Sequence, residues 1–160
     1  MGGMMDLEIT PEVMLSEGPV DPGVVTEATR RFASDGRFGG IASFTGIVRA
    51  DETGEGRVRA IEFTAYQEMA ETGLRELINR VVDESLAAGS ENAGPVRVHL
   101  EHALGEVAVG EAPVIIVVAT GHREEAFAIC RGILEALKQE IPIYGKELLE
   151  GEGYRWKKNR

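Results

Sequence analysis

Residues 113–142, PVIIVVATGHREEAFAICRGILEALKQEIP, decide the fold class of this chain. The first eight residues are almost all apolar, which is typical of a central strand covered on both faces of a sheet. Residues 126–137 then repeat apolar side chains at helical spacing. The helix is expected to end near Glu140, because Pro142 disfavours helical backbone in the residue before it. The stretch therefore predicts a helix packed on a buried strand.

Strand and helix patterns alternate on both sides of this stretch. A helix is expected from Asp21-Pro22, an N-cap followed by proline, to about Ser34, and a second one from Ala70 to Ala88, with apolar residues along one face. The polar, glycine-rich segment 50–56 predicts a loop. Further strands are expected at residues 5–9, 39–49, 58–66, 96–102, 105–109 and 143–149, with a turn at 151–153 before 154–156.

Adjacent strand pairs interrupt a strict βαβ rhythm, which favours an α+β fold. We expect a mixed, largely antiparallel sheet with packed helices, in one domain over residues 1–160 that ends in a basic tail at 154–160. The glycines inside 39–49 indicate that this strand comes close to another backbone or to a ligand.

The composition limits the classes of function. The 160 residues include 17 basic and 27 acidic ones, and a net charge of -10 argues against a nucleic-acid groove. The longest apolar run, 112–119, is far shorter than the ~20 residues of a membrane helix, and the first six residues lack the features of a signal peptide. The single cysteine, Cys130, lies on the apolar face of its helix, which predicts a buried, unreactive thiol. We expect a cytoplasmic protein.

Common nucleotide and metal signatures are absent from the sequence, which has no GxGxxG, P-loop, HExxH or cysteine pair. His99, His102 and His122 lack the spacing of metal ligands. The first two lie on or beside a strand and are interpreted as structural residues. No metal or other cofactor is expected.

The junction between the buried strand and the helix is the first candidate site. Thr120 is placed to cap the helix, and His122 and Arg123 follow it. Cations oppose the dipole at a helix N-terminus, so their presence there is explained if an anion such as phosphate docks on the free N–H groups. The alternative is an exposed His-Arg pair that merely follows a strand, and the local pattern favours neither.

Three further cations are candidates for an anion site. Arg49 ends the segment FTGIVR, residues 44–49, and is either a surface arginine or one aimed at a phosphate or carboxylate. Lys138 lies in the last helical turn, where the dipole alone favours a lysine. Lys146 follows in the next strand, and the turn at Pro142 could bring it back toward Lys138. Two lysines that face one site lower each other's pKa and suit an acid, a base or an anion-binding pair.

Together these segments resemble one family, the large catalytic subunit of molybdopterin synthase. The similarity covers residues 5–156, and it rests on the order and spacing of seven short blocks. The blocks are Gly39-Gly40 with 44–49; Tyr66 with Met69-Ala70; His102 with Gly105-Glu106; 122–127; Leu137-Lys138; Pro142 with Lys146-Glu147; and Trp156.

The resemblance implies a sulfurtransferase of molybdenum cofactor biosynthesis on an α/β-hammerhead-type domain. The family converts cyclic pyranopterin monophosphate to molybdopterin by installing a dithiolene. The sulfur arrives as a thiocarboxylate on the C-terminal Gly-Gly of a small ubiquitin-like subunit. Two large subunits form a central homodimer with a small subunit at each end, which makes a heterotetramer. Neither a nucleic acid nor a membrane is expected as a partner.

The resemblance also implies roles for particular residues. Lys138 is the expected catalytic lysine, with Lys146 as a second candidate, and His122 and Arg123 are expected to reach the pocket of the neighbouring protomer. Phe44 is expected to line the pocket. The expected substrate-binding residues are Ile47, Val48, Arg49, His122, Arg123, Lys138, Gly145, Lys146 and Glu147.

The sequence departs from the family pattern at three positions. Tyr144 replaces a tryptophan, Ala103 replaces an arginine, and Gly145 replaces the second active-site lysine. In a regular strand, residues 145 and 146 point to opposite faces. We expect a bulge at Gly145 that turns Lys146 into the pocket.

A regular strand would instead leave Lys138 as the only lysine of the pocket, helped by a base from the tail such as Arg155 or Arg160. The missing lysine also leaves two other functions open. One is a non-catalytic pterin-phosphate-binding module on the same fold, and the other is a scaffold that only holds the ubiquitin-like partner.

Overall fold

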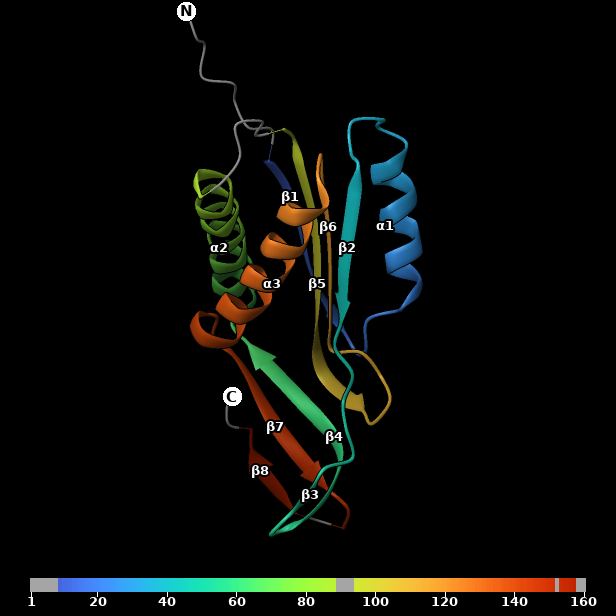
Figure 1. Cartoon of the computed structure of the whole chain (residues 1–160). Coiled ribbons are helices and arrows are strands. Elements are labelled where there is room, and N and C mark those ends of the chain that lie inside the picture. The colour runs from blue at the N-terminus through green and yellow to red at the C-terminus, as the bar shows by residue number, and fades with distance from the viewer. Residues whose placement is uncertain (1–8, 89–93, 152, 158–160) are drawn as a thin grey trace, which may run out of the picture.

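The computed structural model describes residues 9–88, 94–151 and 153–157 of the chain. Helices and strands alternate along it without a long irregular segment between them (Figure 1). In chain order the elements are β1 (Ile9–Glu17), α1 (Gly23–Ala33), β2 (Gly40–Thr45), β3 (Glu52–Thr53), β4 (Gly56–Ala65), α2 (Gln67–Ala87), β5 (Val96–Ala108), β6 (Val114–Thr120), α3 (Arg123–Glu140), β7 (Ile143–Leu149) and β8 (Tyr154–Trp156).

The strands form one mixed sheet in the order β2-β6-β5-β4-β7-β8, and β1 and β3 pair with β5 and β4 respectively. Only β1 and β5 run parallel, and every other described pair is antiparallel. Figure 1 shows α2 and α3 on one face of the upper sheet and α1 on the other, while β3, β4, β7 and β8 extend below the helices. The predicted α+β fold with a largely antiparallel sheet and packed helices is confirmed.

The core lies on both faces of β6, in which every residue is buried. Val114, Ile116 and Val118 pack toward α2 and α3, whereas Ile115 and Val117 belong to the cluster on the α1 side. Cys130 lies in the core stripe of α3 as predicted, and burial raises the pKa of its thiol to about 11. Among the described residues, no helix is both long and apolar enough to span a membrane.

The two strands predicted at 96–102 and 105–109 are a single strand, β5, so the predicted break is wrong. Gly105 adopts a φ of +83°, a conformation that other residues rarely adopt, and the strand continues through it. Residues before Gly105 pair with β6, and residues from Gly105 onward pair with β4. β5 therefore connects the part of the sheet that the helices cover with the part formed by β3, β4, β7 and β8.

Other predicted bounds also differ from the structure. The strand predicted at 5–9 falls mostly outside the described residues, and β1 instead runs from Ile9 to Glu17. β2 ends at Thr45, earlier than the predicted 49, and the predicted loop 50–56 contains β3, which pairs with the start of β4. The predicted first helix is present as α1, but it begins at Gly23 with Pro22, not Asp21, at the N-cap position. The Gly23 N–H donates to Asp21 Oδ1 at 2.8 Å.

The predicted close approach at the paired glycines is confirmed. A Cβ on Gly39 would overlap the carbonyl oxygen of Gly121, and one on Gly40 would lie 3.1 Å from Arg123 Cα. The Gly39 N–H also donates to the Thr120 carbonyl at 2.9 Å. These two glycines let the start of β2 lie directly against the junction between β6 and α3.

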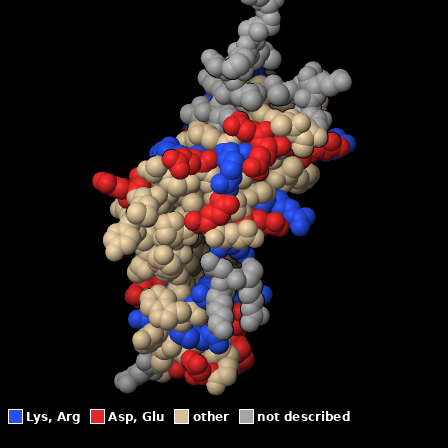
Figure 2. Space-filling model, turned by 90° about the vertical axis from the view of Figure 1, so that its left-hand side faces the viewer, with Lys and Arg blue, Asp and Glu red and all other residues tan. Residues whose placement is uncertain are grey.

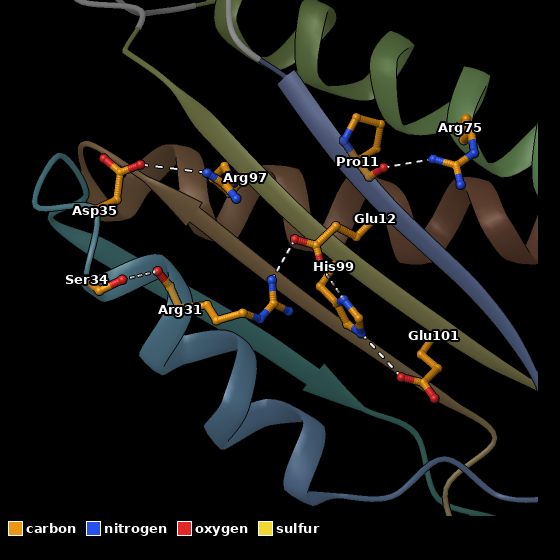
Figure 3. Close-up of polar contacts among 9 residues, drawn as sticks. All are labelled: Pro11, Glu12, Arg31, Ser34, Asp35, Arg75, Arg97, His99 and Glu101. Carbon is orange, nitrogen blue, oxygen red and sulfur yellow. Dashed lines mark hydrogen bonds and ion pairs between the residues drawn. The ribbon is translucent and has the colours of Figure 1, made fainter.

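His99 has a structural role, as predicted. Its Nδ1 lies 3.0 Å from Glu12 Oε2 of β1, and its Nε2 lies 3.3 Å from Glu101 Oε2 (Figure 3). Arg31 of α1 donates to Glu12 Oε1 at 2.7 Å, so one network joins α1, β1 and β5. Burial raises the pKa of Glu12, but the bonds from Arg31 and His99 outweigh it and hold that pKa below 4.5.

Candidate active site

A small pocket lies where the segment after β2 meets β7 and the residue after β8. Its volume is about 80 Å³, and four of its lining residues are predicted site residues. Its lining includes Ile47, Val48, Arg49, Asp51, Glu147 and Lys157. Residues far apart in the sequence therefore meet at one place below the helical layer.

The backbone of 46–49 is held by the turn between β5 and β6. The Val48 N–H donates to the Glu111 carbonyl at 3.0 Å, and the Gly110 N–H donates back to the Val48 carbonyl at 2.9 Å. Val48 is buried, which leaves Arg49 at the rim with 81% of its side chain exposed. Its guanidinium is 3.3 Å from Asp51 Oδ2, an exposed pair that leaves the arginine available to an anion.

β7 contributes Gly145 and Glu147 to the pocket side of the sheet. These residues face Phe63 and Ile61 of β4 in the strand register. The Glu147 side chain is only 13% exposed, and its Oε2 lies 3.6 Å from Arg155 Nε of β8. A carboxylate and a guanidinium therefore line this face beside the space that Gly145 leaves.

Among the described residues, Lys157 is a cation that lies directly beside that space. Its Cβ lies 3.5 Å from the position of a Cβ on Gly145. Much of the side chain faces solvent, yet neighbouring atoms desolvate its ammonium group, which lowers its pKa below 10.5. The charges of Lys138 and Arg49 lower the pKa of Lys157 further, while Glu147 and Asp51 oppose them.

Lys138 approaches the same region from the last turn of α3. It is exposed, and its charge is near enough to lower the pKa of Lys157. Figure 2 shows basic side chains gathered on this side of the molecule at the height of β7 and β8, below a broad uncharged surface. On a chain with a net charge of -10, such a concentration of cations favours an anionic ligand.

Lys146 lies on the opposite face of β7, so the predicted bulge is wrong. The register between β4 and β7 is regular from Ile143 to Leu148, and its only shift falls near Arg59 of β4. The Lys146 ammonium sits 3.9 Å from the ring centroid of Tyr154 and 5.9 Å from that of Trp156. In this chain Lys146 is therefore held in a cation–π contact outside the pocket.

His122 and Arg123 lie at the other end of α3 from Lys138. Fifteen residues of helix separate Arg123 from Lys138, which is about 22 Å along the axis. Both side chains are exposed, and no side chain caps the helix. Thr120 was predicted to cap it, but its hydroxyl donates to the His122 carbonyl at 2.5 Å instead. One protomer therefore does not bring His122 and Arg123 to the pocket.

Two further predicted positions can be placed. Phe44 was expected to line the pocket, but it packs against the core between the sheet and helices α2 and α3. His102 is buried, with Nδ1 2.7 Å from the Ala103 carbonyl and its ring edge-on to Phe63. Burial, with a smaller effect from the charge of Lys157, lowers the pKa of His102 to about 4, although the bond to the Ala103 carbonyl opposes this shift.

Lys157 is the site residue that sequence reasoning missed. The sequence does carry a signal for it, because 143–149, the turn at 151–153 and 154–156 form a hairpin. Extending the register Lys146–Trp156 by one residue places Lys157 opposite Gly145.

No group of three or more His, Cys, Asp or Glu side chains within the described residues is arranged to hold a metal ion.

Comparisons with known proteins agree on one family. Residues 15–140 match the family model described as MoaE protein. The chain is 33% identical over 145 residues to the molybdopterin synthase catalytic subunit of Caulobacter vibrioides, covering 90% of this chain and 87% of the relative. It is 32% identical over 148 residues to the catalytic subunit of Thermoplasma volcanium, covering 92% and 98%.

Solved structures share the fold over most of the chain. The molybdopterin synthase of Staphylococcus aureus superposes with a TM-score of 0.70 at 26% identity, covering 92% of this chain and 96% of that one. A chain from the complex of subunits 1 and 2 of the molybdopterin-converting factor of Helicobacter pylori gives a TM-score of 0.72 at 21% identity, covering 92% and 91%. The latter likeness supports the fold alone.

Proposed function

The chain belongs to the MoaE family and takes part in molybdenum cofactor biosynthesis, and from this premise we propose that it is the sulfur-transferring catalytic subunit of a molybdopterin synthase. Its substrate is cyclic pyranopterin monophosphate. Its sulfur donor is the C-terminal thiocarboxylate of a small ubiquitin-like subunit. The single observation that carries the proposal is the presence of Arg49 and Lys157 at one pocket of an acidic chain, with Lys138 near enough for its charge to act on Lys157.

Both reactants are anions, which explains the sign of the charges at the pocket. Arg49 is exposed at the rim, where a guanidinium can hold a phosphate or a carboxylate through two parallel hydrogen bonds. His122 and Arg123 serve the pocket of a second protomer, because within their own chain they lie about 22 Å from Lys138 along α3. Two copies of the chain therefore complete each other's sites in a homodimer. One small ubiquitin-like subunit, called the carrier subunit below, binds at each end.

The chemistry exchanges oxygen for sulfur without oxidation or reduction. The thiocarboxylate sulfur forms a bond to a substrate carbon as a carbon–oxygen bond breaks, and the departing oxygen takes a proton. Water then cleaves the acyl–sulfur bond, which leaves a thiol on the substrate and a carboxylate on the carrier. Lys138 is the proposed proton donor to the departing oxygen, a step worth roughly 10²–10⁴-fold in rate.

A reconstitution assay tests this function. The purified chain is mixed with a thiocarboxylated carrier subunit and the pyranopterin, and mass spectrometry follows the replacement of two oxygens by two sulfurs. Product is expected from the wild type and not from Lys138→Ala, and a carrier that ends in an ordinary carboxylate provides the control. Since Lys138 is exposed, its removal should change the free energy of unfolding by less than about 0.5 kcal/mol.

A second candidate function is supported by the glycine at position 145. Without an amine at that position, the same fold could serve as a pterin-phosphate-binding module that does no chemistry. Binding of the pyranopterin without any sulfur transfer in the assay would favour this alternative. Efficient transfer would exclude it.

A further inference from the structure

Lys157 and Gly145 are neighbours across the β7–β8 hairpin. The Lys157 N–H donates to the Gly145 carbonyl at 2.8 Å, and the preceding pair in the register is Trp156 with Lys146. Residues directly opposite each other in a sheet present their side chains to the same face. Lys157 therefore projects from the same face as a side chain at 145 would.

The Lys157 stem adjoins the position that a side chain at 145 would take. A Cβ at position 145 would lie 3.3 Å from Ile61, 3.4 Å from Phe63 and 3.5 Å from Lys157 Cβ. Gly145 and Lys157 also line a second hollow of about 200 Å³ together with Tyr144 and Trp156. Lys157 thus lies next to the space from which a lysine at 145 would have extended.

The charges around Lys157 are those of the proposed site. Lys138 of α3 and Arg49 after β2 are the nearby cations, and Glu147 and Asp51 are the nearby carboxylates. The buried His102 of β5 is also near enough to respond to its charge. Lys146, one residue from Gly145 in sequence, instead points to the other face and contacts two aromatic rings.

We propose that Lys157 provides the second amine of the sulfur-transfer site, from the C-terminal strand instead of from position 145. This role rests on the proposed function. As the carbon–sulfur bond forms and the carbon–oxygen bond breaks, the Lys157 ammonium gives a proton to one departing oxygen. It regains a proton from the water that cleaves the acyl–sulfur bond. With two sulfurs to install, Lys138 and Lys157 together give a proton to each of the two departing oxygens.

The test compares Lys157→Ala with Lys146→Ala, a matched control on the opposite face of the same hairpin. Turnover by the carrier and pyranopterin assay is expected to fall about a hundredfold in Lys157→Ala, the scale of one lost general acid, and to change less than about twofold in Lys146→Ala. The double variant Gly145→Lys/Lys157→Ala is expected to recover most of the loss, because it returns an amine to the adjacent position. A Lys157→Ala variant with near-wild-type turnover would overturn the proposal.

A second measurement reports on Lys157 without depending on turnover. Trace acetylation at a series of pH values, read by peptide mass spectrometry, is expected to give Lys157 a pKa below 10.5, and Lys138→Ala should raise that pKa. If the wild type transfers sulfur and Lys157→Ala does so equally well, the role of Lys157 is overturned and the proposed function stands. A wild type that transfers no sulfur, although Lys157 titrates low, overturns the proposed function and the role of Lys157 with it.

Discussion

His102 shows how a single residue can tie the stability of the fold to pH. It is buried, and its Nδ1 must carry the hydrogen in the bond to the Ala103 carbonyl, since a carbonyl oxygen only accepts. Burial, with a smaller effect from Lys157, holds its pKa near 4, so the folded chain keeps the ring neutral where the unfolded chain protonates it. His102 is therefore a source of acid sensitivity rather than a candidate acid or base for the reaction.

The free energy of unfolding is expected to fall as the pH drops from 6.5 toward 4. The unfolded chain binds a proton at His102 below pH 6.5 and the folded chain does so only near pH 4, so acid favours the unfolded chain. The full difference corresponds to about 3 kcal/mol. Urea unfolding at pH 6.5, 5.8 and 5.0 measures the part of this decrease that develops above pH 5, where most carboxylates stay ionised.

His102→Gln should remove most of that slope, and His122→Gln should leave it unchanged because His122 is exposed. A wild-type slope that persists in His102→Gln would show that another group carries the pH dependence.

At the scale of elements, the glycine pair at the start of β2 sets the position of the β6–α3 junction. Gly39→Ala would force its Cβ against the Gly121 carbonyl oxygen, a backbone atom that does not yield without moving the segment that carries His122 and Arg123. The expected cost is about 2 kcal/mol in the free energy of unfolding, the range for overpacking. Chemical denaturation measures it.

Gly54→Ala is the matched control, since no atom lies within 4 Å of a Cβ at that position. Its free energy of unfolding should stay within about 0.5 kcal/mol of the wild type. Equal effects of the two substitutions would contradict the close approach at Gly39.

Elements with a strong local pattern could be predicted from the sequence. β6, α2 and α3 carry continuous or helically spaced apolar side chains, and β7 has the predicted bounds 143–149. The errors fall where tertiary pairing overrides a local signal. The sequence predicts a break before Gly105, between strands at 96–102 and 105–109. Pairing with β6 before Gly105 and with β4 from Gly105 onward keeps β5 continuous.

The candidate site could be predicted only in part, because tertiary pairing also decides which side chains reach it. Arg49 and Glu147 line the pocket, and the charge of Lys138 reaches it. The place of Lys157 depends on the register of the β7–β8 hairpin, which local patterns do not fix. The bulge expected at Gly145 is absent because β7 pairs regularly with β4.

At the scale of the whole molecule, the proposed site needs two chains. The helix α3 holds Arg123 at one end and Lys138 at the other, so a site that uses both is shared between protomers. Phe127, one turn after Arg123, is 66% exposed.

Light scattering is expected to give twice the 17.3 kDa mass of the chain at micromolar concentration. A stable monomer at that concentration would count heavily against a shared site.

The central claim is that each sulfur-transfer site uses Lys138 of one chain and Arg123 of the other. Mixed dimers test this claim most directly. Lys138→Ala and Arg123→Ala are each expected to be inactive when assayed alone. After exchange of subunits, half of the dimers contain one chain of each kind, and each such dimer has one intact site, so about a quarter of the wild-type activity should return. If the mixture stays as inactive as its components after exchange has been verified, or if Arg123→Ala alone is fully active, the shared site is contradicted.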